Sequence, residues 1–337
     1  MISFDMLNHN WQKVLIASTI AYSLLIPFSA CGAQKDISVP PFFSYLMGSG
    51  VTPSLIAFNP SGFDPRQPFE VNETSLAELR KDLRIIKVAF NGLILYEMLP
   101  GLTAAILATA QELGFKAVLL GIWDPKSERE IADTAELIRQ YHVKLSLAVV
   151  IGNEGLIDNR YTIEDVQQAA LRLQTLIPAD ASIPVTSSEP VSEYGWKPLR
   201  EFGEFLAPNI HPAIDQESLD PVAGAEWVKK RANALAVAAK KPVLVKETGV
   251  PNGGALSYTP ETQRLFWEAY FRNGRLVRVN TVNTWISLAA SFEAFDTPWK
   301  AEKTEMLIEG HWGFLDIKRN PYPVFEALRN ANTWAPK

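Results

Sequence analysis

Two glutamates in the chain each stand directly after a short apolar run. Glu154 follows the segment Val149 to Asn153, and Glu247 follows the segment Val243 to Lys246. Such short apolar runs are typical of buried strands, so both carboxyl groups are expected at strand ends. Two carboxyl groups held close together can serve as a general acid and as a nucleophile or base, which is what glycoside hydrolysis requires. Taken singly, either glutamate could equally well cap a helix or pair with a lysine.

The rest of the chain alternates short apolar runs with amphipathic stretches, which predicts repeated strand-helix units and a parallel sheet. Capping patterns before the helices include Ser75 with Glu78, Ser127 with Glu130, Asp220-Pro221 and Thr259-Pro260. Eight such units predict an α/β fold, a single (β/α)8 TIM barrel over residues 46–337, with a doubly wound open sheet as the alternative. The expected strands are Leu55 to Phe58, Ile86 to Phe90, Ala117 to Leu120, Leu145 to Val150, Ile183 to Thr186, Phe205 to Ile210, Val243 to Val245, and one between Val282 and Leu288.

A barrel places its working residues in the loops after the carboxyl ends of the strands, because these loops form one shared face. The residues at these positions are carboxylates, amides and aromatic side chains, which can bond sugar hydroxyls and cover pyranose rings. The sequence therefore predicts a carbohydrate-binding cleft, with Asn59 and Asn91 also on its rim. Besides Glu154 and Glu247, the residues expected to bind substrate are Asn153, Glu189, His211, Trp123, Trp285, Glu293, Asp296, Trp299 and Trp312.

Structural roles remain open for several of these residues. Glu189 and Glu293 could bind sugar hydroxyls or orient the catalytic pair from behind. His211 could be a substrate ligand or a hydrogen-bonded structural histidine. Trp227 and Trp267 lie inside helical patterns and are expected to be packing residues.

Several short motifs occur in one order along the chain and together resemble glycoside hydrolase family 17, in particular its compact bacterial branch. The resemblance implies a barrel that acts on β-1,3-glucan with retention of configuration and without a metal or organic cofactor. It implies that Glu154 is the general acid/base and Glu247 the nucleophile, and Asn153 would bond the sugar 2-hydroxyl. The motifs are Leu120 to Trp123, Ile151 to Glu154, Thr186 to Glu189, Lys246 to Pro251, Phe292 to Lys300 and Glu309 to Gly313.

The chain departs from the family pattern beside the expected site. Val250 stands where the family usually has Trp or Tyr, and Pro212 to Ile214 follow His211 where the family often has aromatic residues. The length of the glucan site, and whether water or a second sugar is the acceptor, therefore stay open. The expected function is a laminarinase-like endo-hydrolase, and the alternative is a β-1,3-glucanosyltransferase. A non-catalytic glycan-binding lipoprotein is a third, less favoured interpretation.

Residues 1–30 have the pattern of an export signal. Lys13 is followed by an uncharged, mostly aliphatic stretch from Val14 to Ala30, which is short for a membrane span. The only cysteine, Cys31, follows it in a sequence that resembles a bacterial lipoprotein box. We expect a lipoprotein signal, a tether over residues 31–45, and a periplasmic or cell-surface enzyme that is lipid-anchored at Cys31. Ordinary cleavage near Ala30 or Ala33 and an uncleaved anchor are the alternatives.

The composition argues against several other classes of protein. The chain has 337 residues, of which 47% are hydrophobic and 20% charged, as in compact globular proteins. The formal charge is -5 and the basic residues form no cluster, so a nucleic acid partner is not expected. A single cysteine cannot form an internal disulfide, and the four histidines lack the spacing of a zinc site. The expected partner is a β-glucan polysaccharide or oligosaccharide, bound by a monomer.

Overall fold

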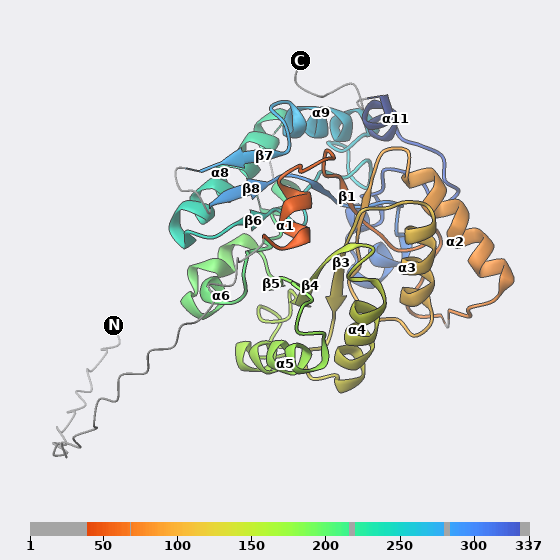
Figure 1. The fold of residues 1–337 in the computed structure, drawn as a ribbon. Helices are drawn as coiled ribbons and strands as arrows, with labels where there is room; N and C mark the ends of the chain where they lie inside the picture. The colour runs from red at the N-terminus through yellow and green to blue at the C-terminus, as the bar shows by residue number, and fades with distance from the viewer. Residues whose placement is uncertain (1–38, 68, 216–219, 280–283, 331–337) are drawn as a thin grey trace, which may run out of the picture. The chain divides into compact units, whose positions relative to one another are not determined.

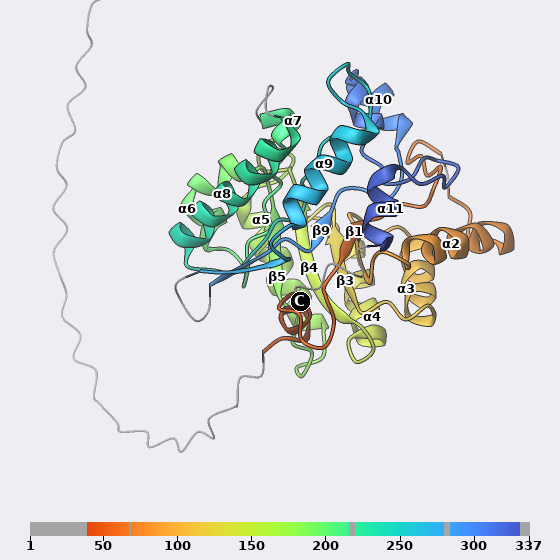
Figure 2. The ribbon, with the colours of Figure 1, turned by 90° about the horizontal axis from the view of Figure 1, so that it is seen from above.

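The computed structural model describes residues 39–67, 69–215, 220–279 and 284–330; the predicted signal segment and Cys31 lie outside them. Within this part of the chain, helices surround a parallel sheet (Figures 1 and 2). The main sheet has six parallel strands in the order β5-β4-β3-β2-β1-β9. They are β1 (Leu55–Ala57), β2 (Gly92–Ile94), β3 (Ala117–Ile122), β4 (Ser146–Asn153), β5 (Val185–Ser188) and β9 (Ala290–Ser291).

The remaining strands close this sheet into a barrel. β6 (Val243–Leu244) pairs in parallel with β8 (Trp285–Ser287), which is followed two residues later by β9. Residues 204–210 bridge β5 and β6, since Asn209 N–H donates to the Glu189 carbonyl at 3.0 Å and Leu244 N–H donates to the Leu206 carbonyl at 2.8 Å. β7 (Leu276–Arg278) adds an antiparallel strand beside β8. The predicted TIM barrel is confirmed, and the open-sheet alternative is wrong.

Six helices of 11 or more residues supply most of the outer layer, and none of the described helices is long and apolar enough to cross a membrane. Three of the four predicted caps are confirmed at Ser127, Asp220 and Thr259. The fourth is wrong, because Asn72 rather than Ser75 caps its helix. The longer helices are α2 (Glu73–Ile86), α3 (Leu102–Glu112), α4 (Glu128–Tyr141), α5 (Ile163–Leu176), α8 (Pro221–Ala239) and α9 (Pro260–Phe271). The shorter ones are α1 (Pro41–Leu46), α6 (Lys197–Glu201), α7 (Pro212–Asp215), α10 (Pro298–Thr304), α11 (Pro323–Asn330) and the 3-10 turns Val191–Gly195 and Leu307–Gly310.

Helix α1 packs against side chains that point into the barrel at its amino-terminal end. Its residues Phe42, Tyr45 and Leu46 are buried in one cluster with Leu55 and Leu244. This spacing of apolar residues forms one helical face, which gains hydrophobic stabilisation by covering the open end of the barrel. The predicted tether over residues 31–45 is therefore wrong at its carboxyl end, since the domain already includes α1.

The second strand lies later in the sequence than predicted. The segment predicted as a strand, Ile86 to Phe90, is the last residue of α2 and the turn after it, and β2 begins at Gly92. A glycine is needed there because a Cβ would lie 2.5 Å from the Leu55 side chain. Asn91 consequently precedes its strand, where it accepts a 2.6 Å hydrogen bond from the Tyr45 hydroxyl. It lies at the amino-terminal end of the barrel, so its predicted place on the rim is wrong.

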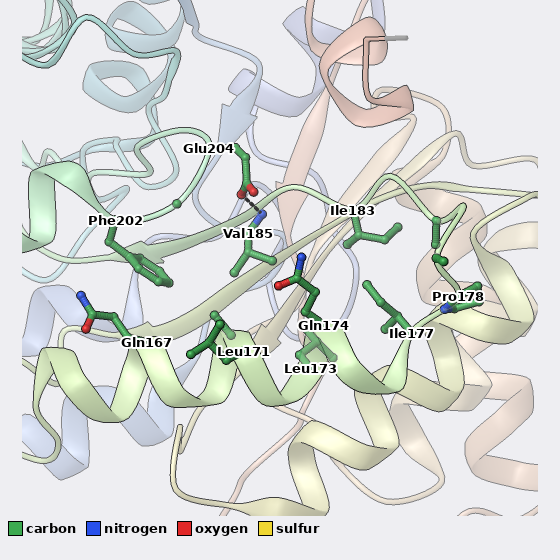
Figure 3. Close-up of a pocket in the computed structure, with 14 residues that line it drawn as sticks. Gln167, Leu171, Leu173, Gln174, Ile177, Pro178, Ile183, Val185, Phe202 and Glu204 are labelled. Carbon is green, nitrogen blue, oxygen red and sulfur yellow. Dashed lines mark hydrogen bonds between the residues drawn. The ribbon is translucent and has the colours of Figure 1, made fainter. Parts of the chain in front are cut away.

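A groove runs along the outside of the barrel between α5 and the start of β5 (Figure 3). Leu171, Ile177, Ile183 and Phe202 line it, and Glu204 accepts a 2.8 Å hydrogen bond from the Val185 N–H at one wall. Its lining comes from α5, from the segment that leads into β5 and from residues 202–204, and it includes neither of the two predicted catalytic glutamates.

Candidate active site

The carboxyl ends of the strands bring Glu154 and Glu247 to the same mouth of the barrel. Glu154 directly follows β4, and Glu247 lies just beyond β6. Asn209 connects them: its backbone pairs with that of Glu247, and its side-chain Nδ2 donates to Glu154 Oε1 at 2.7 Å. The two carboxyl groups predicted from separate motifs are thus neighbours in space.

A local irregularity at the end of β4 places Glu154. The pairing of β4 with β5 shifts register between Val150 and Asn153, and Gly152 has a φ of +79°. A Cβ on Gly152 would lie only 2.2 Å from the Tyr161 hydroxyl, so glycine is required there for both conformation and space. Glu154 itself has a φ of 54°, which sets it apart from the regular strand that precedes it.

Glu247 is a buried carboxylate held by two basic side chains. It is 5% exposed, its Oε1 accepts a hydrogen bond from Lys246 Nζ, and its Oε2 lies 3.5 Å from His211 Nε2. Burial alone would raise the pKa of Glu247, but the Lys246 ammonium and the contact with His211 outweigh it and lower the pKa to about 2. Glu247 is therefore ionised at neutral pH, as a nucleophile must be.

Glu154 is shifted in the opposite direction. Partial burial and the nearby charge of Glu247 raise the pKa of Glu154 above its usual value, and the hydrogen bond from Asn209 only partly offsets them. Environments that move the pKa values of two adjacent carboxyl groups apart separate the acid from the carboxylate. The geometry suits Glu154 to donate a proton and Glu247 to attack.

The oxygen of the Asn153 side-chain amide is bonded within the protein. Its Oδ1 accepts hydrogen bonds from Lys246 Nζ at 2.8 Å and from Asn209 Nδ2 at 3.2 Å. Among the described residues none accepts from its Nδ2, and the side chain is half-buried beside Glu154. The NH₂ group is thus the end available to a ligand.

Aromatic side chains back this site. The His211 ring packs edge-on against Trp312 at 5.0 Å and against Phe292 at 5.5 Å between ring centroids. Trp312 is 1% exposed, so its predicted role as an open stacking platform is wrong, and it supports His211 from behind. Tyr96, in the loop after β2, lies under Lys246 Nζ, and burial and the charge of Glu247 raise its pKa well above the ordinary value.

Two further glutamates, Glu189 and Glu293, are bonded to groups of the protein itself. Glu189 is fully buried and accepts hydrogen bonds from the N–H groups of Gly155 and Leu156, so it holds the loop that follows Glu154. Glu293 is 2% exposed and pairs with Lys300, with Nζ 2.8 Å from Oε2. Both carboxylates therefore support the site from behind.

Burial raises the pKa of Glu189 to about 7, so this group is only partly charged at neutral pH. We therefore expect Glu189→Gln to lower the free energy of unfolding by about 0.5–1.5 kcal/mol, the usual net contribution of a hydrogen bond between neutral groups. The loop after Glu154 would loosen because an amide keeps one acceptor oxygen for the N–H groups of Gly155 and Leu156 but loses the second oxygen, which accepts from the Ile157 N–H at 3.4 Å. Denaturant unfolding would measure the change.

Glu193→Gln is the matched control, since among the described residues this carboxylate accepts a side-chain hydrogen bond only from the adjacent Ser192 hydroxyl. Equal stability of the two variants would contradict the anchoring role.

Two of the predicted aromatic ligands, Trp123 and Trp299, are partly exposed. Trp123 follows β3 and is 37% exposed, with the Arg160 guanidinium 4.3 Å from its ring centroid. Trp299, in α10, is partly exposed beside Lys300. These two tryptophans remain candidate platforms for sugar rings.

Two of the predicted substrate ligands are not in the site. Trp285 begins β8 at the amino-terminal end of the barrel, where its ring packs edge-on against Phe43 at 5.5 Å. Asp296 accepts hydrogen bonds from Tyr322 at 2.6 Å and from Asn252 at 3.0 Å, so it ties loops together. Both predictions of substrate binding are therefore wrong.

Three residues that the sequence did not single out contribute to the site: Tyr96, Asn209 and Lys246. Asn209 was a polar residue inside the apolar run Phe205 to Ile210, which was a usable signal. In the described part of the chain, His, Cys, Asp and Glu side chains form no group that could hold a metal ion. The polar side chains that meet at the site are those of Glu154, Glu247, Asn153, Asn209, Lys246, His211 and Tyr96.

Paired carboxyl groups of opposite pKa shift, at the carboxyl-terminal mouth of a TIM barrel, define a barrel glycosidase. The model of the BtgE/BtgC glycoside hydrolase domain matches residues 61–313, and the chain belongs to this family. The predicted family-17-like glycosidase is thereby confirmed as a class. No curated protein matches the chain in sequence.

Solved structures share this fold at low sequence identity. The Rhizomucor miehei β-1,3-glucanosyltransferase, an active-site mutant in complex with laminaritriose, matches with a TM-score of 0.61 and 20% identity over 81% of this chain and 96% of that chain. An endo-laminarinase from Formosa Hel1_33_131 matches with a TM-score of 0.64 and 16% identity over 83% of this chain and 87% of that chain. A β-1,3-glucanase and allergen of Cryptomeria japonica pollen matches with a TM-score of 0.59 and 14% identity over 81% of this chain and 98% of that chain.

Proposed function

We propose that this glycosidase cleaves β-1,3-glucosidic bonds in β-1,3-glucan and retains the anomeric configuration. The observation that carries the proposal is the pair Glu154 and Glu247. Asn209 joins the two residues, and the pKa of Glu154 is raised while that of Glu247 is lowered. The substrate class is supported by proteins of the same fold whose substrates are β-1,3-glucans. It is also supported by the family-17-like motifs around both glutamates.

In the first step, the Glu154 carboxyl group donates its proton to the glycosidic oxygen while a Glu247 carboxylate oxygen attacks the anomeric carbon. The bond to the leaving sugar breaks, and an ester forms between Glu247 and the remaining sugar. In the second step, Glu154 takes a proton from water or from a sugar hydroxyl. The resulting oxygen nucleophile displaces Glu247 and restores its carboxylate.

The electrostatics of the pair explain how Glu154 changes role. The charge of Glu247 is one cause of the raised pKa of Glu154 in the free enzyme. This charge disappears when Glu247 becomes an ester, so the pKa of Glu154 falls. Glu154 therefore holds its proton when an acid is needed and gives it up readily once a base is needed.

The Asn153 amide contributes during both steps. Its NH₂ group would donate to the sugar 2-hydroxyl, a hydrogen bond that strengthens as the oxocarbenium-like transition state forms. Trp123 is partly exposed, and Arg160 contacts both its ring and the Asn153 carbonyl, so Trp123 would cover the ring of the leaving or accepting sugar.

A β-1,3-glucanosyltransferase is the second candidate, because the exposed Trp123 offers a surface on which an acceptor sugar could compete with water. The first step is identical in both functions, and only the acceptor differs. Both glutamates are present and hydrogen-bonded at the same mouth of the barrel, which disfavours a non-catalytic glycan-binding protein.

We further propose that the enzyme is exported and anchored by a lipid on Cys31 in the periplasm or at the cell surface. This proposal rests only on the lipoprotein-like sequence outside the described residues. The mass of the mature amino-terminal peptide tests it. A diacylated Cys31 is expected, and a mature chain that begins at another residue would contradict the anchor.

The experiment that tests the function is incubation with linear β-1,3-gluco-oligosaccharides, with products followed over time by NMR and mass spectrometry. Shorter products that appear first as the β-anomer are expected for a retaining hydrolase. Products longer than the substrate would shift the assignment to the transferase. The α-anomer as first product, or no turnover at all, would overturn the proposal.

A further inference from the structure

Lys246 is a buried lysine that directly precedes Glu247. It is 1% exposed, and its Nζ donates both to Glu247 Oε1 and to Asn153 Oδ1, the latter at 2.8 Å. The ammonium also lies 4.5 Å from the centre of the Tyr96 ring. It thus contacts the ends of three different strands at the mouth of the barrel.

A lysine is seldom fully buried, because its ammonium must lose its hydration shell. Here, two hydrogen bonds and the face of an aromatic ring replace the lost water. The side chains of Lys246 and Glu247 meet on the same side of the backbone, although adjacent residues of a regular strand point to opposite faces. This is possible because β6 has already ended at Leu244, two residues earlier.

We infer that Lys246 is a positioning residue that holds the carboxylate of Glu247 and the amide of Asn153 in one fixed arrangement toward the sugar. The inference rests on the proposed function of the same site. Lys246 engages one oxygen of Glu247, so the other oxygen is the one left beside His211. Lys246 also engages the Asn153 oxygen, so the NH₂ group of this amide is turned toward the ligand.

The charges around Glu247 show why a cation is needed there. Glu154 and Glu293 carry acidic groups close enough to interact with Glu247, and the Tyr96 phenol also faces it. The basic groups near Glu247 are Lys246, His211 and Lys300, and the Arg160 guanidinium lies further out, where it donates to the Asn153 carbonyl. Lys300 forms its hydrogen bonds with Glu293, which leaves Lys246 as the ammonium that is hydrogen-bonded to Glu247.

The test is the pH profile of kcat/KM for a β-1,3-gluco-oligosaccharide in wild type, Lys246→Met and Lys246→Arg. Removing an opposite charge at hydrogen-bond distance raises the pKa of an acid by about 1–3 units. The acidic limb of Lys246→Met is therefore expected to move upward by about 1–3 pH units. Lys246→Arg, which keeps the charge, is expected to keep the limb close to that of wild type.

A second readout separates positioning from simple loss of packing. If Lys246 orients Asn153, Lys246→Met is expected to lower kcat for the normal substrate much more than for a 2-deoxy substrate, which cannot use the amide. Lys241→Met is the matched control, because Lys241 precedes the same strand and bonds backbone carbonyls at the other end of the barrel. It is expected to leave the profile unchanged.

Lys246→Gln replaces Lys246→Met if the latter does not fold, since glutamine retains hydrogen-bond donors without a charge. An unshifted acidic limb together with an equal loss on both substrates would overturn the inference. NMR titration of a ¹³C-labelled Glu247 carboxyl group in wild type and variant needs no substrate. It therefore tests Lys246 even if β-1,3-glucan proves not to be the substrate, and an unchanged pKa of Glu247 would also overturn the inference.

Discussion

Glu247→Ala is expected to lower kcat on β-1,3-glucan by at least about 10⁴-fold, with glucan binding nearly unchanged, because the group that forms the covalent bond is gone. Added azide can occupy the vacated space and attack the anomeric carbon from the same face. We therefore expect partial recovery of turnover on an activated aryl β-glucoside, with an α-glycosyl azide as product. Product analysis by NMR is the measurement.

Glu204→Gln is the control for Glu247→Ala, because Glu204 accepts a hydrogen bond from the Val185 N–H outside the site. It is expected to keep wild-type turnover. Turnover of Glu247→Ala close to that of wild type, or a β-glycosyl azide as its rescue product, would show that another group is the nucleophile.

Glu154→Gln is expected to slow cleavage of glucan by about 10²–10⁴-fold, the usual contribution of a general acid. An aryl glycoside with a good leaving group, such as dinitrophenolate, needs little protonation and is expected to be cleaved in the first step at a rate closer to that of wild type. Steady-state and burst kinetics on the two substrates measure the difference. Glu164→Gln, at the exposed start of α5, serves as control. An equal loss on both substrates would contradict the role of Glu154 as acid.

The two opposite pKa shifts also predict the pH dependence of activity. The first step needs Glu247 without a proton and Glu154 with one. Activity should therefore rise as Glu247 ionises, with a pKa of about 2, and fall when Glu154 loses its proton above the ordinary pKa of a glutamate. In Glu154→Gln the basic limb of the kcat/KM profile is expected to disappear. A basic limb that persists in this variant would assign the acid to another residue.

Much of this architecture could be predicted from the sequence because apolar runs and capping residues are local signals. Strands β1, β3 and β4 begin within one residue of their predicted starts. The strand before Tyr96 was misplaced because Ile85 and Ile86 form an apolar run although they end a helix, while the true strand begins with Gly92. Because of this error, Asn91 was predicted to lie on the rim, and Tyr96, which follows the true strand, was not recognised as a site residue.

The catalytic pair could be recognised because each glutamate lies within a motif, whereas its supporting residues depend on contacts between distant segments. Asn209 meets Glu154 across 55 positions of sequence, and Lys246 meets Asn153 across 93. Trp285 and Trp312 show the converse: an aromatic residue near a strand end can pack inside the protein as readily as it can face a ligand. Only the three-dimensional arrangement distinguishes these cases.

The most direct test of the account is to trap the covalent intermediate with 2-deoxy-2-fluoro-β-laminaribiosyl fluoride. The 2-fluorine slows hydrolysis of the ester because it destabilises the oxocarbenium-like transition state, and the fluoride leaving group lets the ester form. Peptide mass spectrometry of the inactivated enzyme is expected to show one fluorosugar attached to Glu247. A label on Glu154 or Glu293, or complete resistance of an otherwise active enzyme to the inhibitor, would contradict the proposed nucleophile and mechanism.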